Sequence, residues 1–176
     1  MSEGPPRLGP RYEPLALLGT GGFGQVWRVW DRQLGRAVAL KTLRPERADR
    51  TGQLQHFLDE ARMTARFQHP GVVVVHELEY LPEGQLGLVM REIKGQTLRE
   101  RLQREASRTA LVQILHRVCQ TVGYAHEQGI VHRDLKPANI MIDDEGVVMV
   151  VDWGMAGLKD RVSRRGGTPG FLSLIH

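Results

Sequence analysis

The sequence predicts an α+β fold in two parts, a β-rich first part with one main helix and a mainly helical second part. Three observations lead to this prediction. Short apolar runs separated by glycine-rich turns dominate up to Met90, with a single helical pattern near 51–67. A polar linker follows at 91–95. After the linker, apolar residues recur with helical spacing. We therefore expect three segments: a flexible lead-in at 1–10, a first lobe at 11–93 and a second lobe at 94–176.

The composition is that of an ordinary globular protein. The 176 residues are 41% hydrophobic and 25% charged, which permits a sizeable core, and the net charge of +4 fits acidic or phosphorylated partners without demanding nucleic acid. No apolar run reaches about 18 residues, so we expect no membrane span. The single cysteine, Cys119, lies in an apolar helical pattern and predicts a buried, inert thiol. A lone cysteine also favours a reducing compartment, which we interpret as the cytoplasm.

The first part opens with a strand, a glycine loop and a second strand. The apolar run Leu15–Leu18 leads into the loop, and alternation resumes from Gln25 to Trp30. The loop holds four glycines: Gly19, Gly21, Gly22 and Gly24. Dinucleotide-binding folds share this spacing but require a helix after it, whereas a β-type run follows here. The loop is therefore predicted to be a hairpin flap whose backbone N–H groups can lie close over phosphates.

A third strand is predicted at 37–41. Alternation places Val38 and Leu40 on one face. Ala39 and Lys41 share the opposite face, where small side chains leave room for something flat, such as a nucleotide base. Taken alone, Lys41 is by default interpreted as an exposed strand lysine.

A helix is predicted from Thr51 to about Phe67. Its expected apolar face is made of Leu54, Phe57, Leu58, Ala61 and Ala65. Glu60 lies at the margin of this face, from which it is either solvated or reaches inward to pair with Lys41. Two further strands are expected, at Val72–Val75 and at Leu86–Met90.

The second part begins with two predicted helices. Thr97 is expected to cap a helix that carries Arg101, Arg104 and Arg108 along one solvated face. A long buried helix is then predicted to end near Gly129, and its apolar positions are Leu111, Val112, Leu115, Val118, Cys119, Val122 and Ala125. A short strand at 130–131 follows.

The segment from His132 to Asn139 leads into a predicted hairpin. Its strands are Ile140–Ile142 and Val147–Val151, joined by a turn. The antiparallel return brings Asn139 and Asp152 together, beside a segment that already holds Asp134 and Lys136. Amide and carboxylate oxygens near a lysine suit Mg²⁺ and phosphate. The alternative is a polar loop that merely caps a hairpin.

Six ordered motifs resemble the eukaryotic-like, bacterial-type serine/threonine protein kinases. The resemblance runs from Tyr12 to Ser173. It is carried by Gly19-x-Gly21-x-x-Gly24-x-Val26, Val38-Ala39-Leu40-Lys41, Glu60, His132 to Asn139, Asp152-Trp153-Gly154, and Gly167 to Ser173. It implies a two-lobed kinase fold, ATP and Mg²⁺ as cofactors, and a protein substrate with a Ser or Thr acceptor.

The resemblance also implies a role for each matched residue. Asp134 would orient and deprotonate the attacking hydroxyl, and Lys136 would offset charge on the γ-phosphate. Asn139 and Asp152 would hold Mg²⁺. Lys41, positioned by Glu60, would pair with the α- and β-phosphates. Leu18 and the four loop glycines would also bind the nucleotide. Val26, Ala39 and Met141 would surround adenine, Met90 would be the gatekeeper, and the backbone of Arg91 and Ile93 would form the hinge.

The sequence departs from the family at two places. Trp153 replaces the usual Phe, a conservative change because a large aromatic ring can still pack there. After Ser173 the family continues with Pro-Glu and several helices, whereas this chain reads Leu174-Ile175-His176. We therefore expect an incomplete second lobe with an exposed apolar underside.

The segment after Gly154 holds the remaining functional candidates. Ser163 is the one hydroxyl between Asp152 and Thr168 that can carry a phosphate for Arg133 to read. The arginines at 161, 164 and 165 lack interleaved aromatic residues, so we expect no nucleic-acid partner. Two other functions stay open: an ATP-binding fragment without catalysis, and a kinase-like small-molecule phosphotransferase.

Overall fold

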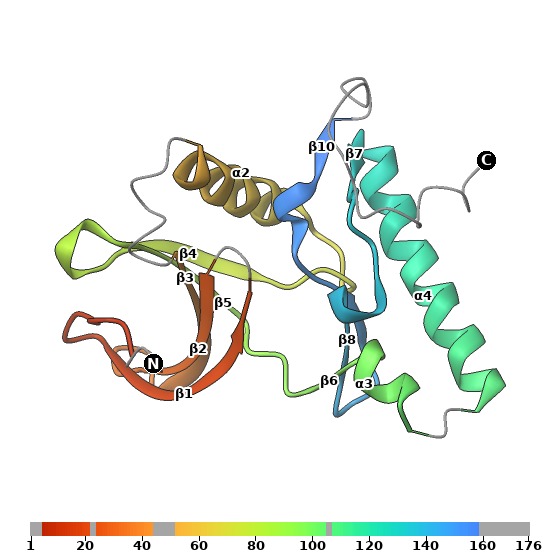
Figure 1. Ribbon diagram of the computed structural model, residues 1–176, viewed down its shortest axis with the longest axis horizontal. Helices are drawn as coiled ribbons and strands as arrows, with labels where there is room; N and C mark the ends of the chain where they lie inside the picture. The colour runs from red at the N-terminus through yellow and green to blue at the C-terminus, as the bar shows by residue number, and fades with distance from the viewer. Residues whose placement is uncertain (1–4, 22–23, 44–51, 105–106, 159–176) are drawn as a thin grey trace. The chain divides into compact units, whose positions relative to one another are not determined.

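The computed structural model describes residues 5–21, 24–43, 52–104 and 107–158 (Figure 1). The chain divides into two compact units. The first comprises Met1–Ala65 with Val74–Glu92, and the second comprises Arg66–Val73 with Ile93–His176. The predicted α+β class is confirmed, since a five-stranded sheet with one helix occupies the first unit and two helices with short strands occupy the second.

The first unit is built on an antiparallel sheet of order β1-β2-β3-β5-β4. The strands are β1 (Tyr12–Thr20), β2 (Gly24–Asp31), β3 (Arg36–Leu43), β4 (Val75–Tyr80) and β5 (Leu86–Met90). The predicted hairpin around the glycines forms, because β1 and β2 pair from Tyr12 opposite Asp31 to Thr20 opposite Gln25. The fifth predicted strand has the expected bounds.

The two faces of this sheet bury different clusters. One face packs Val38 and Leu40 with apolar residues of its neighbours, namely Tyr12, Trp27, Val29, Leu81 and Val89. The other face carries Ala39 and Lys41, as alternation predicts, and is covered by helix α2 (Gln53–Arg66) through Phe57 and Ala61, which pack with Leu43, Leu86 and Leu88. The helix therefore lies on the same sheet face as Lys41.

The buried face of α2 differs from the predicted one. Leu54 is 41% exposed and Ala65 is exposed, so both were wrongly placed in the core. Thr64, which is 5% exposed, takes a buried position instead. The stripe that faces the sheet is centred on Phe57 and Ala61, and this rotation moves Glu60 from the margin into the covered surface.

The strand predicted at Val72–Val75 was wrong in its bounds. Val72 makes only an isolated bridge to Val150 within the second unit, and β4 starts at Val75. β4 was missed because its sequence, Val-His-Glu-Leu-Glu-Tyr, has charged residues on one face. Those charges are compensated: Arg11 lies 2.7 Å from Glu77, and its guanidinium also donates two hydrogen bonds to Asp31.

Within the described residues, the second unit contains two helices and three short pairings of strands. The helices are α3 (Leu98–Leu102) and α4 (Arg108–Glu127). One sheet has the order β6-β8-β9, and a second pairs β10 with β7. Their strands are β6 (Gly95–Thr97), β7 (Ile130–Val131), β8 (Ile140–Asp143), β9 (Val148–Val150) and β10 (Gly157–Leu158), with single 3₁₀ turns at Pro137–Asn139 and Trp153–Met155. A further 3₁₀ turn, Pro82–Gly84, lies in the first unit.

Helix α3 is shorter than predicted. Thr97 caps it as expected, in a capping box with Glu100. The helix ends at Leu102, however, so Arg104 lies beyond it, and Arg108 is the first residue of α4. The predicted stripe of three arginines does not exist, because Ser107 caps a new helix between them.

Helix α4 buries a narrower stripe than predicted. Its buried residues are Ile114, Val118, Thr121 and Ala125. Val112 and Leu115 are 60% and 61% exposed, and Cys119 is an exposed thiol, so the prediction of a buried Cys119 was wrong. The buried positions recur at i, i+4, i+7 and i+11, and the other apolar residues lie off that stripe. Among the described helices, none combines the length and the apolar character needed to cross a membrane.

Candidate active site

Lys41 and Glu60 form a close ion pair within the first unit. Lys41 Nζ donates to both carboxylate oxygens of Glu60, at 2.5 and 2.7 Å. The two side chains are 15% and 11% exposed. β3 supplies the lysine and α2 supplies the glutamate, because α2 covers that face of the sheet. Mutual compensation allows both charges to be withdrawn from water, and the pairing predicted from sequence is present.

Of the residues predicted to surround adenine, Val26 and Ala39 lie on this sheet face, whereas Met141 lies on β8 in the second unit. Val26 lies directly opposite Lys41, and Ala39 lies directly opposite Met90. Facing residues in adjacent strands project to the same side of a sheet. Beyond Met90, the backbone N–H of Arg91 donates to Val74 O at 2.9 Å, which ties the end of β5 to the start of β4.

The glycines of the loop have different structural reasons. A Cβ on Gly24 would lie 1.9 Å from the carbonyl oxygen of Thr42, so the close pairing of β2 with β3 requires glycine there. A Cβ on Gly19 or Gly21 would have no neighbour closer than 4.0 Å among the described residues. Leu18 is skipped by the β1–β2 register and is 47% exposed. Gly22 lies outside the described residues.

Asp134, Lys136 and Asn139 converge in the second unit. Lys136 Nζ lies 2.5 Å from Asp134 Oδ2. The side-chain amide of Asn139 donates to the Asp134 backbone carbonyl at 2.9 Å and to its Oδ2 at 3.3 Å. Asp134 is therefore held by a cation and an amide at once. Its side chain is 15% exposed, which leaves it a restricted route to solvent.

His132 fixes the backbone beneath Asp134, a role that sequence reasoning missed. Its Nε2 lies 3.0 Å from Val151 O, and its Nδ1 accepts from the Asp134 backbone N–H at 3.3 Å. These two contacts together assign the neutral imidazole with the proton on Nε2. Burial lowers the pKa of His132 below its ordinary value, although the Val151 carbonyl favours the charged form. The sequence signal for this role was the motif from His132 to Asn139, in which His132 precedes Asp134 by two residues.

The hairpin β8–β9 aligns the residues on either side of it. The Val151 N–H donates to Asn139 O at 2.9 Å, so the chain leaves the hairpin beside Asn139 and continues directly into Asp152. Asp152 is exposed and adopts a left-handed backbone, with φ 63°. Met141 lies on β8 between Thr97 of β6 and Met149 of β9. Ile93 is half-buried at the start of this unit.

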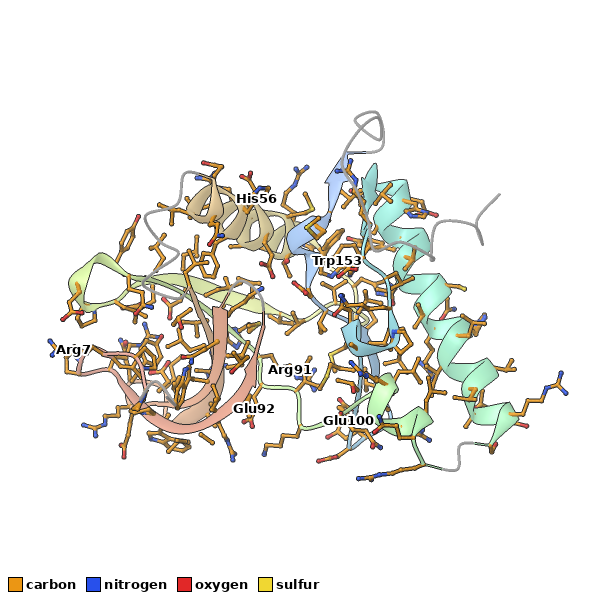
Figure 2. The ribbon with its side chains drawn as sticks, in the orientation of Figure 1. Arg7, His56, Arg91, Glu92, Glu100 and Trp153 are labelled. Atoms are coloured by element: carbon orange, nitrogen blue, oxygen red, sulfur yellow. The ribbon has the colours of Figure 1, made fainter. Side chains whose placement is uncertain are left out.

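Trp153 anchors the end of this segment (Figure 2). It is 1% exposed, and its ring centroid lies 4.7 Å from each of the rings of Phe67 and His132. Its indole N–H donates to Val150 O at 3.1 Å. A phenylalanine at this position has no such donor. Trp153 therefore packs against two rings of the second unit and makes a hydrogen bond that a phenylalanine could not make.

The donor chemistry of Asn139 and Asp152 suits magnesium. Both offer hard oxygen ligands, which Mg²⁺ prefers. Asn139 uses its amide nitrogen toward Asp134, and this fixes the orientation of its oxygen. Asp152 is exposed, so a cation can reach it without displacing the core.

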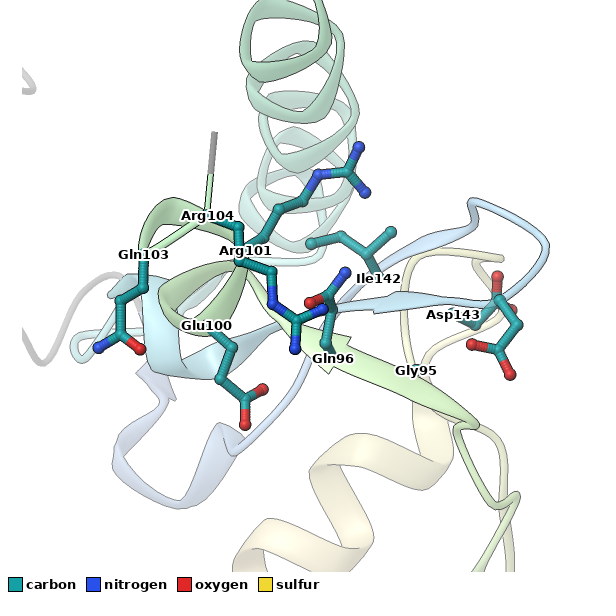
Figure 3. Close-up of a pocket in the computed structure, with 9 residues that line it drawn as sticks. Gly95, Gln96, Glu100, Arg101, Gln103, Arg104, Ile142 and Asp143 are labelled. Carbon is teal, nitrogen blue, oxygen red and sulfur yellow. The ribbon is translucent and has the colours of Figure 1, made fainter. Parts of the chain in front are cut away.

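A separate hollow of about 780 Å³ lies between α3 and the β6–β8 pair (Figure 3). Arg101 and Gln96 lie near its centre, and Asp143 lies toward one end. None of the residues predicted to bind nucleotide or to act in catalysis lines it. The candidates at Arg161, Ser163, Arg164, Arg165 and Thr168 all lie outside the described residues.

Comparison with known proteins identifies the family. The protein kinase domain matches residues 12–173. A probable serine/threonine-protein kinase of Streptomyces coelicolor is 39% identical over 159 residues, covering 88% of this chain and 24% of the relative. Serine/threonine-protein kinase PknA of Mycobacterium tuberculosis is 38% identical, covering 87% of this chain and 37% of the relative. Serine/threonine-protein kinase PknD of Chlamydia muridarum is 35% identical, covering 85% of this chain and 17% of the relative.

The chain thus spans between about a sixth and just over a third of the length of these relatives. The match covers almost all of the chain itself, and it contains every charged residue of the two clusters described above. Proteins of this family generally use ATP and Mg²⁺. The chain belongs to the protein kinase domain family, and its relatives are serine/threonine protein kinases.

Proposed function

We propose that this chain carries the nucleotide site and catalytic loop of a protein serine/threonine kinase. The reaction is transfer of the ATP γ-phosphoryl group to a Ser or Thr hydroxyl of a protein. The observation that supports it most directly is the Asp134 carboxylate, held by Lys136 and Asn139 on a backbone fixed by His132. Its lone thiol, Cys119, fits the cytoplasm, which is the compartment we propose.

Asp134 is the residue that handles the proton. Its carboxylate accepts the hydrogen bond of the acceptor hydroxyl, orients the oxygen toward the γ-phosphorus and takes up the proton as the new P–O bond forms and the bond to ADP breaks. Lys136, already beside this carboxylate, offsets negative charge on the transferring group. Asn139 and Asp152 would hold Mg²⁺, which neutralises phosphate charge when bound.

In the first unit, Lys41 is the residue that binds the phosphates of the nucleotide. Glu60 holds its amine in one place, so the amine is ordered before the nucleotide arrives. Val26, Ala39 and Met90 provide an apolar strip on the same sheet face for the base. Backbone N–H groups of the loop from Gly19 to Gly24 cover the phosphates.

The substitution Asp134→Asn tests this proposal. It should lower the rate of phosphoryl transfer from Mg-ATP to an acceptor protein at least about a hundredfold, because the proton acceptor is lost. ADP affinity, measured by calorimetry on the same chain, should change less than about twofold, because Asp134 acts on the hydroxyl. The matched control is Asp144→Asn, an exposed carboxylate in the turn of the same hairpin, which should leave both quantities unchanged.

The possible outcomes separate the competing functions. Undiminished transfer in Asp134→Asn contradicts the role given to this residue. A wild-type chain that binds Mg-ADP but transfers nothing is a nucleotide-binding module. Transfer to small alcohols in preference to proteins identifies a small-molecule phosphotransferase.

A further inference from the structure

Arg28, on the sheet face that carries Lys41, forms an ion pair with Glu92 within the first unit. Arg28 Nε lies 3.1 Å from Glu92 Oε1. Arg28 comes from β2. Glu92, labelled in Figure 2, follows β5 by two residues. The Glu92 side chain is only 9% exposed, whereas that of Arg28 is 38% exposed. A carboxylate so far withdrawn from water requires compensation, and Arg28 supplies it.

The pair links strands that flank the strip proposed for adenine. Arg28 lies directly opposite Ala39 in β3, and Ala39 lies directly opposite Met90 in β5. The three residues therefore form one row across the sheet, on the side that also bears Lys41. The ion pair therefore joins β2 to the residues just after β5, with β3 lying between these two strands in the sheet.

The Nε–H of Arg28 shows that the contact is chiefly electrostatic. This nitrogen is shielded from solvent and makes no hydrogen bond among the described residues, although Glu92 Oε1 is within 3.1 Å. A misaligned pair gives less directional stabilisation than a bidentate one. Its value here is positional: it holds the residues just beyond Met90 against β2, where Arg91 also donates its backbone N–H to Val74 O.

We propose that Arg28 and Glu92 are positioning residues that fix the end of β5 for nucleotide binding. The pair sets the spacing between β2 and the Arg91–Glu92 backbone, and hence the width of the strip formed by Val26, Ala39 and Met90. This inference rests on the proposed function, because the strip matters only if a nucleotide binds there. The pair itself exists independently of it.

The experiment combines Arg28→Met with the charge-reversed double variant Arg28→Glu/Glu92→Arg in the full chain. Arg28→Met should weaken ADP binding about fivefold, within the range of measured pair couplings. It should also raise the hydrogen-exchange rate of the Arg91 amide, whose bond to Val74 O depends on the position of this segment. The double variant should restore ADP affinity to within about twofold of the original.

Arg32→Met is the matched control. Arg32 follows β2 and pairs with Glu13 at 2.9 Å, but its side chain is 60% exposed and it has no partner in β3. Exposed pairs contribute little, so this variant should leave ADP affinity and Arg91 exchange unchanged. Arg28→Lys keeps the charge, and it should fall between the wild type and Arg28→Met. It decides the matter if the double variant does not fold.

Two results overturn the inference. One is an Arg28→Met chain with unchanged Arg91 exchange. The other is a loss of ADP affinity that neither charge reversal nor Arg28→Lys reduces. If the wild-type chain binds no ADP while Arg91 exchange still responds to Arg28→Met and recovers on charge reversal, the proposed function fails but the positioning role stands.

Discussion

Replacing Trp153 by phenylalanine isolates what its indole contributes to the second unit. The substitution keeps an aromatic ring beside Phe67 and His132, whose centroids lie 4.7 Å from that of Trp153. It removes the N–H that donates to Val150 O at 3.1 Å. It also leaves a gap where the second ring stood, in a site where Trp153 is 1% exposed. Phenylalanine is the family's usual residue, so the change tests a feature particular to this chain.

The expected cost follows from these two losses. Leaving a buried acceptor without its donor costs about 1–3 kcal/mol. Removing all of a buried tryptophan side chain costs about 3–5 kcal/mol. Phenylalanine keeps the larger share of this stabilisation because it keeps an aromatic ring at the site. We therefore expect Trp153→Phe to lower the free energy of unfolding by about 2 kcal/mol, and Trp153→Ala to lower it by about 4 kcal/mol.

Urea unfolding followed by far-ultraviolet circular dichroism measures this difference without relying on tryptophan emission. The control is Trp30→Phe, since Trp30 is 39% exposed on β2. That control should change stability by less than about 0.5 kcal/mol, as is usual for exposed positions. If Trp153→Phe costs no more than Trp30→Phe, the hydrogen bond to Val150 and the packing of the indole do not contribute as argued.

Two further predictions concern protonation and the glycine loop. Because burial lowers the pKa of His132, the unfolded chain binds more protons there, so the stability it contributes is present above an unfolded pKa of about 6.5 and is lost as pH falls below that value. Urea titrations at several pH values should show this loss, and His132→Phe should flatten it. Gly24→Ala should destabilise the fold, since its Cβ would lie 1.9 Å from Thr42 O. Gly21→Ala should leave thermal stability unchanged but weaken ADP binding, and the reverse pattern would contradict the loop's proposed role.

The strands of the first unit were predictable because each has a strong local signal. Alternation in β3 correctly separated Val38 and Leu40 from Ala39 and Lys41. β4 was placed wrongly because Glu77 and Glu79 look solvent-facing in sequence, and their compensation comes from Arg11, more than sixty residues earlier. A local pattern carries no information about a partner so distant along the chain.

Helix faces were predicted less well than helix positions. In α4 the sequence offers more apolar residues than one stripe can bury, and the stripe is chosen by what packs against it. Thr121 is 1% exposed because its hydroxyl donates to the Arg117 carbonyl, whereas Cys119 is exposed. The polar Thr121 is thus buried and the Cys119 thiol is exposed. Hydrophobic periodicity alone predicts the opposite burial for these two residues.

The charged residues of the candidate site were identified from motif spacing, but the residues that support them were not. The pairing of Lys41 with Glu60 was foreseen as one of two possibilities. The contact of His132 with the Asp134 backbone and the Arg28–Glu92 pair were not foreseen. Supporting contacts of this kind follow from three-dimensional neighbours, and neither composition nor period records them.

Backbone conformation gives an independent indication of where this structure is constrained. Among the described residues, three other than glycine have positive φ: Glu83 in a tight turn, Arg133 with φ 66° and Asp152 with φ 63°. Such conformations cost about 1–3 kcal/mol each and persist only where surrounding contacts impose them. Arg133 immediately precedes Asp134, and His132 holds both neighbouring segments through Val151 O and the Asp134 N–H. The buried imidazole of His132 therefore supports the backbone beside both strained residues, since Val151 precedes Asp152 and Asp134 follows Arg133.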